Sequence, residues 1–360
     1  MNKYVLLLLL IFVVSCASPT GKVAISIEDH DADFNSLIVP FEKTQELREQ
    51  LKNELKEYDS TGVGRKEVYE QYIDSLGVNG ILAVLNEINP TCHDEAHDLG
   101  KIVFAKLKSI APALQACNDG CYSGCMHGVM METFSNADVS TESLKSILPE
   151  FCFDKNIASH NKPGDCAHGV GHALMFLSGY DIDNAVNSCS YFGNKAMEYY
   201  CATGTYMEYT NVYEAEDAQS KPEFYPCDTN KFPAACFRYK MNPAMKRLSE
   251  KFGAGAIEIM AKKCLELEGS NRLGCFHGFG NAHVTAIHYG VVSIGYVCSL
   301  GTEDDQKICI EGAIERIAKY EKESALKACE TLSGWKKEVC LEGAEGDMYR
   351  LNKSFELYFS

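Results

Sequence analysis

The sequence predicts an all-α fold of disulfide-stapled helical-hairpin repeats, stacked as an α/α superhelix or solenoid. The first observation behind this prediction is the presence of 17 cysteines in 360 residues, and the second is their regular spacing. A third is a glycine that recurs three residues after the second cysteine of most pairs. The net charge of −16 argues against nucleic acid as a partner, because a negative surface repels phosphates.

The chain begins with a segment that is typical of an export signal. Lys3 precedes an apolar run from Tyr4 to Val14, which is too short to cross a bilayer as a helix. The run ends in Val13-Val14-Ser15-Cys16, and this ending resembles the lipobox of prokaryotic lipoproteins. The resemblance implies that residues 1–15 are a signal peptide and that a lipid on Cys16 anchors the protein to the cell membrane or the outer membrane. The body then lies outside the cytoplasm, where disulfides persist.

Composition divides the rest of the chain into three parts. Residues 16–40 are predicted to be a lipidated tether followed by an extended arm, because they begin with small polar residues. Residues 41–90 are predicted to form N-terminal capping helices, of which the first is highly charged. Residues 91–350 hold the remaining cysteines and are predicted to form the repeat domain.

Cysteine spacing gives the length of the repeat. Without Cys16, 16 of the 17 cysteines remain, which permits eight disulfides. They fall into pairs along the sequence. From one pair to the next, the second cysteine advances by 31 to 41 residues, which is the length of a helix–turn–helix unit. A bond across the tight turn can join the ends of two antiparallel helices. The predicted bridges are Cys152–Cys166, Cys189–Cys201, Cys227–Cys236, Cys264–Cys275, Cys298–Cys309 and Cys329–Cys340.

Four cysteines at the start of the repeats leave more than one pairing open. We favour Cys117–Cys125, because it corresponds to the pair found in every other repeat unit. The additional cysteine of this unit, Cys121, is then left to pair with Cys92. The period and the hairpin pattern over roughly residues 80–350 resemble the tetratricopeptide-like superfamily, especially its secreted, cysteine-stapled branch. The superfamily's Trp and Leu-Gly consensus is not matched. The resemblance implies stacked hairpins with a concave face that can bind an envelope protein or peptide.

The recurring glycine predicts close packing. A glycine inside a helix costs about 1 kcal/mol relative to alanine, so repeated copies need a steric reason. Glycine stands three residues after the second cysteine in six units, and we expect a close approach of two helices at each hairpin.

Histidines gather beside the second cysteines. His93/His97 and His168/His172 are spaced i, i+4, which places both rings of each pair on one helical face. His127, His168 and His277 each follow a second cysteine by two residues, so stacked hairpins align them in a row. Imidazole binds zinc, copper, iron and nickel. The predicted metal ligands are His93, His97, His127, His168, His172 and His277, with His283, Glu132 and Glu208 as supplementary candidates.

The predicted cofactor is a transition metal ion, copper or zinc, with iron as a further option. Met131 and Met207 occupy the register of His172, which slightly favours copper. Two other functions stay open: a non-catalytic envelope scaffold, and a metalloenzyme with Glu132 or Glu208 as general base. The histidines could also be a repeated packing device that bonds neighbouring carbonyls.

Overall fold

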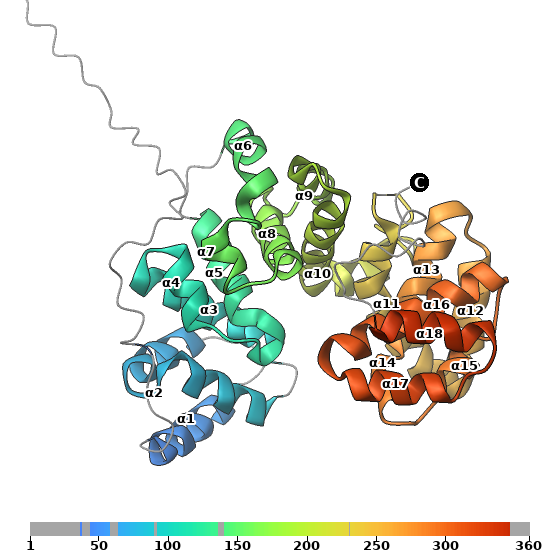
Figure 1. Cartoon of the computed structure of the whole chain (residues 1–360), viewed down its shortest axis with the longest axis horizontal. Coiled ribbons are helices and arrows are strands. Elements are labelled where there is room, and N and C mark those ends of the chain that lie inside the picture. The colour runs from blue at the N-terminus through green and yellow to red at the C-terminus, as the bar shows by residue number, and fades with distance from the viewer. Residues whose placement is uncertain are drawn as a thin grey trace, which may run out of the picture.

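The computed structural model describes residues 37, 44–57, 64–89, 92–135, 140–229 and 231–345. These residues form helices and no strand occurs among them, which confirms the predicted all-α class. The predicted signal peptide, the lipidation site Cys16 and most of the predicted tether lie outside the described residues. The helices follow a curved path, so that the N-terminal and C-terminal halves of the stack face one another (Figure 1).

Two helices cap the N-terminal end of the stack. α1 (Gln45–Glu57) packs against α2 (Arg65–Ile88) and buries Leu51 completely. Lys52 of α1 lies 2.9 Å from Glu87 of α2. The charged sequence of α1 therefore hides a narrow apolar side, which it turns toward the next helix.

Beyond α2, the helices form an inner and an outer set, and an outer segment precedes every inner helix from α5 on except α11. The helices of the inner set pack in sequence, each on the next, and we call them the inner helices because most of them line the cavity described below. They are α3 (His93–Leu107), α5 (Gly124–Ser135), α8 (Pro163–Leu177), α10 (Lys195–Ser220), α11 (Pro233–Phe252), α13 (Gly269–Ala282), α16 (Glu303–Tyr320) and α18 (Trp335–Glu345). The outer helices are α4 (Ile110–Ala116), α6 (Thr141–Phe151), α7 (Lys155–Ala158), α9 (Ile182–Cys189), α12 (Ala256–Leu265), α14 (Val284–His288), α15 (Ile294–Val297) and α17 (Lys322–Glu330).

Eight disulfides staple the described stack. Six of them join the segment before an inner helix to the first turns of that helix, and they are Cys152–Cys166, Cys189–Cys201, Cys227–Cys236, Cys264–Cys275, Cys298–Cys309 and Cys329–Cys340. The first repeats hold Cys92–Cys121 and Cys117–Cys125. Closing loops of this length stabilises a fold by about 2–4 kcal/mol per bridge.

The recurring glycines pack between successive inner helices. A Cβ on Gly100 of α3 would overlap the carbonyl oxygen of Cys125, and a Cβ on Gly128 of α5 would overlap that of His97. The same reciprocal contact joins α8 to α10 and α13 to α16. Close packing at the glycines is therefore present, but the prediction that it lies within each hairpin is wrong. It links an inner helix to the next inner helix, in three tight pairs.

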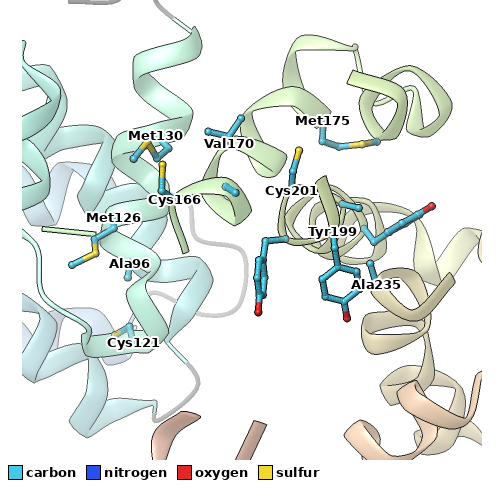
Figure 2. Packing of buried hydrophobic residues seen from close by; sticks show 14 of the residues in the cluster. Ala96, Cys121, Met126, Met130, Cys166, Val170, Met175, Tyr199, Cys201 and Ala235 are labelled. Atoms are coloured by element: carbon cyan, nitrogen blue, oxygen red, sulfur yellow. The ribbon is translucent and has the colours of Figure 1, made fainter. Parts of the chain in front are cut away.

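Buried side chains fill the space between the helices. Figure 2 shows members of this core from successive inner helices, among them Met126 and Met130 of α5, Val170 of α8 and Tyr199 of α10. Half-cystines belong to the same core, since Cys166 and Cys201 are fully buried. The core is thus continuous along the stack and fixes each inner helix against its neighbours.

Candidate metal centre

Five histidines from three inner helices meet at one place, four of them buried and His168 half-buried. His93 and His97 come from α3, His127 from α5, and His168 and His172 from α8. Ring centroids lie 4.6 Å apart for His93 and His97, 4.8 Å for His97 and His172, and 4.8 Å for His127 and His168. Potential ligand atoms of His93, His97, His127 and His172 all lie within 4.8 Å of one another.

The local sequence explains this convergence. The i, i+4 spacing stacks His93 over His97 on one face of α3. The glycine contact between α3 and α5 brings the backbones close enough for His127 to reach the same point. α8 packs against the other side of α5 and contributes the second i, i+4 pair.

Hydrogen bonds on the outer side of three rings fix the position of their protons. His93 Nδ1 lies 3.1 Å from the carbonyl oxygen of Tyr122, and His172 Nδ1 lies 2.9 Å from Glu208 Oε2. Both oxygens only accept hydrogen bonds, so these Nδ1 atoms carry the hydrogen. In a neutral ring with its hydrogen on Nδ1, the Nε2 atom carries the lone pair, and this applies to His93 and His172.

Thr203 fixes the third ring in the same way. Its hydroxyl donates to the carbonyl oxygen of Tyr200 at 2.6 Å, so it can only accept from His168 Nδ1 at 2.8 Å. His168 Nε2 consequently carries a lone pair as well. Outer hydrogen bonds of this kind orient histidines that bind metals.

Inner ring nitrogens face one another across the centre of the cluster. His172 Nε2 lies 3.2 Å from His168 Nε2, and His93 Nε2 lies 3.0 Å from His97 Nε2. His127 Nε2 is buried and has no hydrogen-bond partner among the described residues. Neutral rings with facing lone pairs, as at His168 and His172, repel unless a cation lies between them. The donor set and its outer hydrogen bonds therefore fit a metal ion.

Burial keeps the imidazoles neutral. Desolvation lowers the pKa of His93 to about 3. Desolvation also lowers the pKa of His97, His127 and His168 well below the ordinary value for histidine. Neutral imidazole is the form that binds metals, so the site is ready to do so at neutral pH.

A left-handed turn presents the backbone carbonyls to His93. Cys121, Tyr122 and Ser123 have φ angles of 52°, 55° and 63°, a conformation that costs non-glycine residues roughly 1–2 kcal/mol each. The disulfide Cys92–Cys121 ties this turn to the residue that precedes His93. The bridge thus holds a strained segment against the ring that it orients.

Glu208 acts from outside the cluster. Burial favours its neutral form, but the hydrogen bond from His172 outweighs burial and lowers the pKa of Glu208. Tyr180 donates a further hydrogen bond to it at 3.4 Å. Glu208, a predicted supplementary ligand or general base, thus lies on the outer side of His172.

Three other predicted residues do not join the cluster. His277 lies in α13, where its Nε2 is 3.4 Å from Glu315 Oε1. The aligned row fails there because the units with Thr203 and Arg238 separate α8 from α13. His283 Nδ1 donates to the carbonyl oxygen of Phe279 at 2.7 Å, one helical turn back. Glu132 is not a member of the metal-ligand group, and neither Glu132 nor Glu208 lines the adjacent cavity.

A cavity of about 330 Å³ opens beside the cluster. His93, His127 and His168 form part of its wall, and Arg238, Arg316 and Lys319 from the other half of the chain form another part. The sequence analysis identified neither these cations nor the supporting role of Thr203. Thr203 occupies the same register as His127 and His168, which was the available signal for it.

No protein-family model matches the chain, and neither does a curated protein or a solved structure. None of the described helices is both long and apolar enough to cross a membrane. The number of disulfides indicates an oxidising, extracytoplasmic environment.

Proposed function

We propose that this protein is a lipid-anchored, extracytoplasmic protein that binds one transition metal ion through His93, His97, His127 and His172. The observation that carries the proposal is the convergence of ring nitrogens from four buried histidines, all within 4.8 Å of one another. His168 lies beside these four and faces both His172 and the cavity.

The main competing interpretation is a set of histidines that only support packing. A packing role predicts that each ring bonds to a backbone group of the neighbouring hairpin. In this cluster only His93 bonds to a carbonyl, and the inward nitrogens face one another instead. A buried nitrogen without a partner, His127 Nε2, gains nothing from such a role.

The proposed ion is copper or zinc, with iron as a third option. Four neutral nitrogen ligands suit all three metals, so the ligand set alone does not choose between them. Copper(II) bound to the site would show an electron paramagnetic resonance signal with nitrogen couplings, whereas zinc would be silent. Loading with each metal in turn, followed by removal of excess ion, ranks their affinities.

Elemental analysis of the purified, oxidised protein tests the proposal. We expect one retained ion per chain in the native protein and loss of that ion in His93→Ala/His172→Ala. His160→Ala is the matched control, because His160 lies outside the cluster on the segment before α8. Native protein that stays free of metal after loading with copper, zinc and iron would overturn the proposal.

The lipid anchor has a separate test. Cys16→Ala removes the proposed acylation site, and we expect the variant to appear in the soluble extracytoplasmic fraction. Incorporation of a labelled fatty acid into the native protein, and none into the variant, is the measurement. A variant that still carries label contradicts lipidation at Cys16. Metal content serves as the control, because it should not change.

A further inference from the structure

We infer that the cavity beside the histidine cluster binds a small organic oxyanion, a carboxylate or a phosphate, with Arg316 as its anchoring cation. The inference deepens the proposed function, because the ligand lies against the metal site. Its anion contact nevertheless rests on residues from the opposite half of the chain, and these can be tested on their own.

The cavity brings the two halves of the chain together over one space. His93 and His127 belong both to the metal-ligand group and to the cavity wall. A molecule in the cavity therefore has access to the metal from one side. The volume of about 330 Å³ falls at the small end of the range for ligand sites, roughly 300–1,000 Å³.

Two of the three cations in the wall are already paired with carboxylates. Lys319 Nζ lies 2.7 Å from Asp165 Oδ1, and Arg238 forms an ion pair with Glu315. These pairs cancel most of the charge of their members and leave Arg316 as the candidate for an external anion.

Arg316 has no carboxylate partner among the described residues. Its Nη1 donates to Asn281 Oδ1 at 3.0 Å. Asn281 is itself fixed, because it is buried and its Nδ2 donates to the carbonyl oxygen of Gly312 at 3.2 Å. The guanidinium is thus held in place on the cavity wall with its charge not neutralised. An oriented guanidinium favours bidentate binding of a carboxylate or phosphate.

Arg316 and Asn281 occupy recurring positions of the repeat. Asn281 stands six residues after Cys275, as His172 does after Cys166, and Arg316 stands seven after Cys309, as Glu208 does after Cys201. The α8–α10 pair uses these two positions for a metal ligand and its carboxylate support. The equivalent positions of the α13–α16 pair form an amide and a cation instead. The same two repeat positions therefore support a metal ligand on one side of the cavity and an oriented cation on the other.

The remaining wall residues set the orientation of the ligand. Asp94, the residue after His93, also lines the cavity on the side of the histidines. Its charge disfavours an oxyanion there in the absence of metal and directs the anionic group toward Arg316. Tyr200 and Tyr239 offer apolar ring faces for the body of a small organic molecule.

Isothermal titration of the full chain tests the inference, with succinate, citrate and inorganic phosphate as separate probes on metal-loaded and metal-free protein. We expect saturable binding of succinate or citrate, and a loss of affinity of about tenfold or more in Arg316→Gln. Arg247→Gln is the matched control, since Arg247 is a more exposed arginine that pairs with Glu214 and does not line the cavity. Metal content and melting temperature are measured on each variant.

The outcomes separate the two proposals. Loss of probe binding in Arg316→Gln with metal content unchanged supports the inference. Metal binding without saturable binding of any probe at millimolar concentration overturns the inference and leaves the proposed function standing. Probe binding by a protein that binds no metal supports the inference and overturns the proposed function. Equal probe binding by the native protein and Arg316→Gln overturns the assignment of Arg316 as the anchoring cation. Retention of phosphate but not the organic probes would identify an inorganic anion site, which contradicts an organic ligand.

Discussion

Each histidine of the site has an outer and an inner nitrogen with different tasks. For His93, His168 and His172 the outer nitrogen donates to a carbonyl, a hydroxyl and a carboxylate respectively. The helical spacing of these histidines made the cluster predictable from the sequence. The turn at Tyr122 was not predictable and the repeat register was the one signal for Thr203, because both meet the rings only through the packing of separate helices.

Replacing Glu208 with glutamine removes the charge that supports His172 while leaving a hydrogen-bond acceptor. We expect metal affinity to fall by roughly 10-fold, the low end of the range for such outer contacts. Competition with a chelator of known affinity measures the change. Glu216→Gln on the same helix is the control, because Glu216 is exposed. An unchanged affinity in Glu208→Gln would show that the carboxylate contributes nothing to the site.

The metal-free protein should lose stability in mild acid. Burial depresses the pKa of His93 to about 3 in the folded state, whereas an unfolded histidine titrates near 6.5. The unfolded chain therefore binds more protons between these values, and stability present above pH ~6.5 is lost as the pH falls toward 3. The slope is at most about 1.4 kcal/mol per pH unit for each such histidine.

Urea unfolding of the disulfide-intact apoprotein at several pH values between 7.5 and 4 measures this slope. His93→Gln removes one of the titrating groups and should make the profile shallower. A free energy of unfolding that stays constant over this range would contradict burial of neutral histidines.

At the level of helices, the cysteine spacing predicted the hairpins, and the glycines predicted close packing. The sequence could not show which helices approach, because a glycine can face either its own hairpin or the next one. The reciprocal contacts of Gly171 with Cys201 and of Gly204 with His168 show that the tight pairs form between inner helices. Pairing of this kind sets the distance between α8, which carries two histidines, and α10, which carries Glu208.

Gly171→Ala introduces a methyl group into the carbonyl oxygen of Cys201. We expect a loss of about 1–3 kcal/mol in unfolding free energy, since overpacking a close helix contact forces the backbones apart. Metal affinity should fall as well, because α8 shifts relative to Glu208. Thermal and urea unfolding measure the first effect and chelator competition the second. Gly255→Ala is the control, because no atom lies within 4 Å of its added Cβ, and its stability should stay the same or rise.

At the level of the whole molecule, none of the eight disulfides joins the two halves that face each other. The longest separation between bonded cysteines is 29 residues, in Cys92–Cys121. Non-covalent contacts hold the halves together instead, among them the ion pair of Lys319 with Asp165 across 154 residues of sequence. The sequence could not predict this contact, because the curvature of the stack decides which distant residues meet.

Lys319→Met removes the lysine that pairs with the mostly buried carboxylate of Asp165 and should cost about 1–3 kcal/mol in unfolding free energy. The double variant Lys319→Met/Asp165→Asn should regain part of that loss, because no isolated charge remains. Urea unfolding of the native protein, Lys319→Met, Asp165→Asn and the double variant gives a double-mutant cycle. Additive effects of the two substitutions would show that the residues do not interact.

The short reach of the disulfides also bears on how the protein is made. Each bridge can close as soon as its own few residues have emerged from the export channel, without waiting for the distant end of the chain. The four proposed ligands and Glu208 are all complete by residue 208, before α11 begins. Metal could therefore be captured during secretion, on a nascent chain whose C-terminal half arrives afterwards and closes over the site.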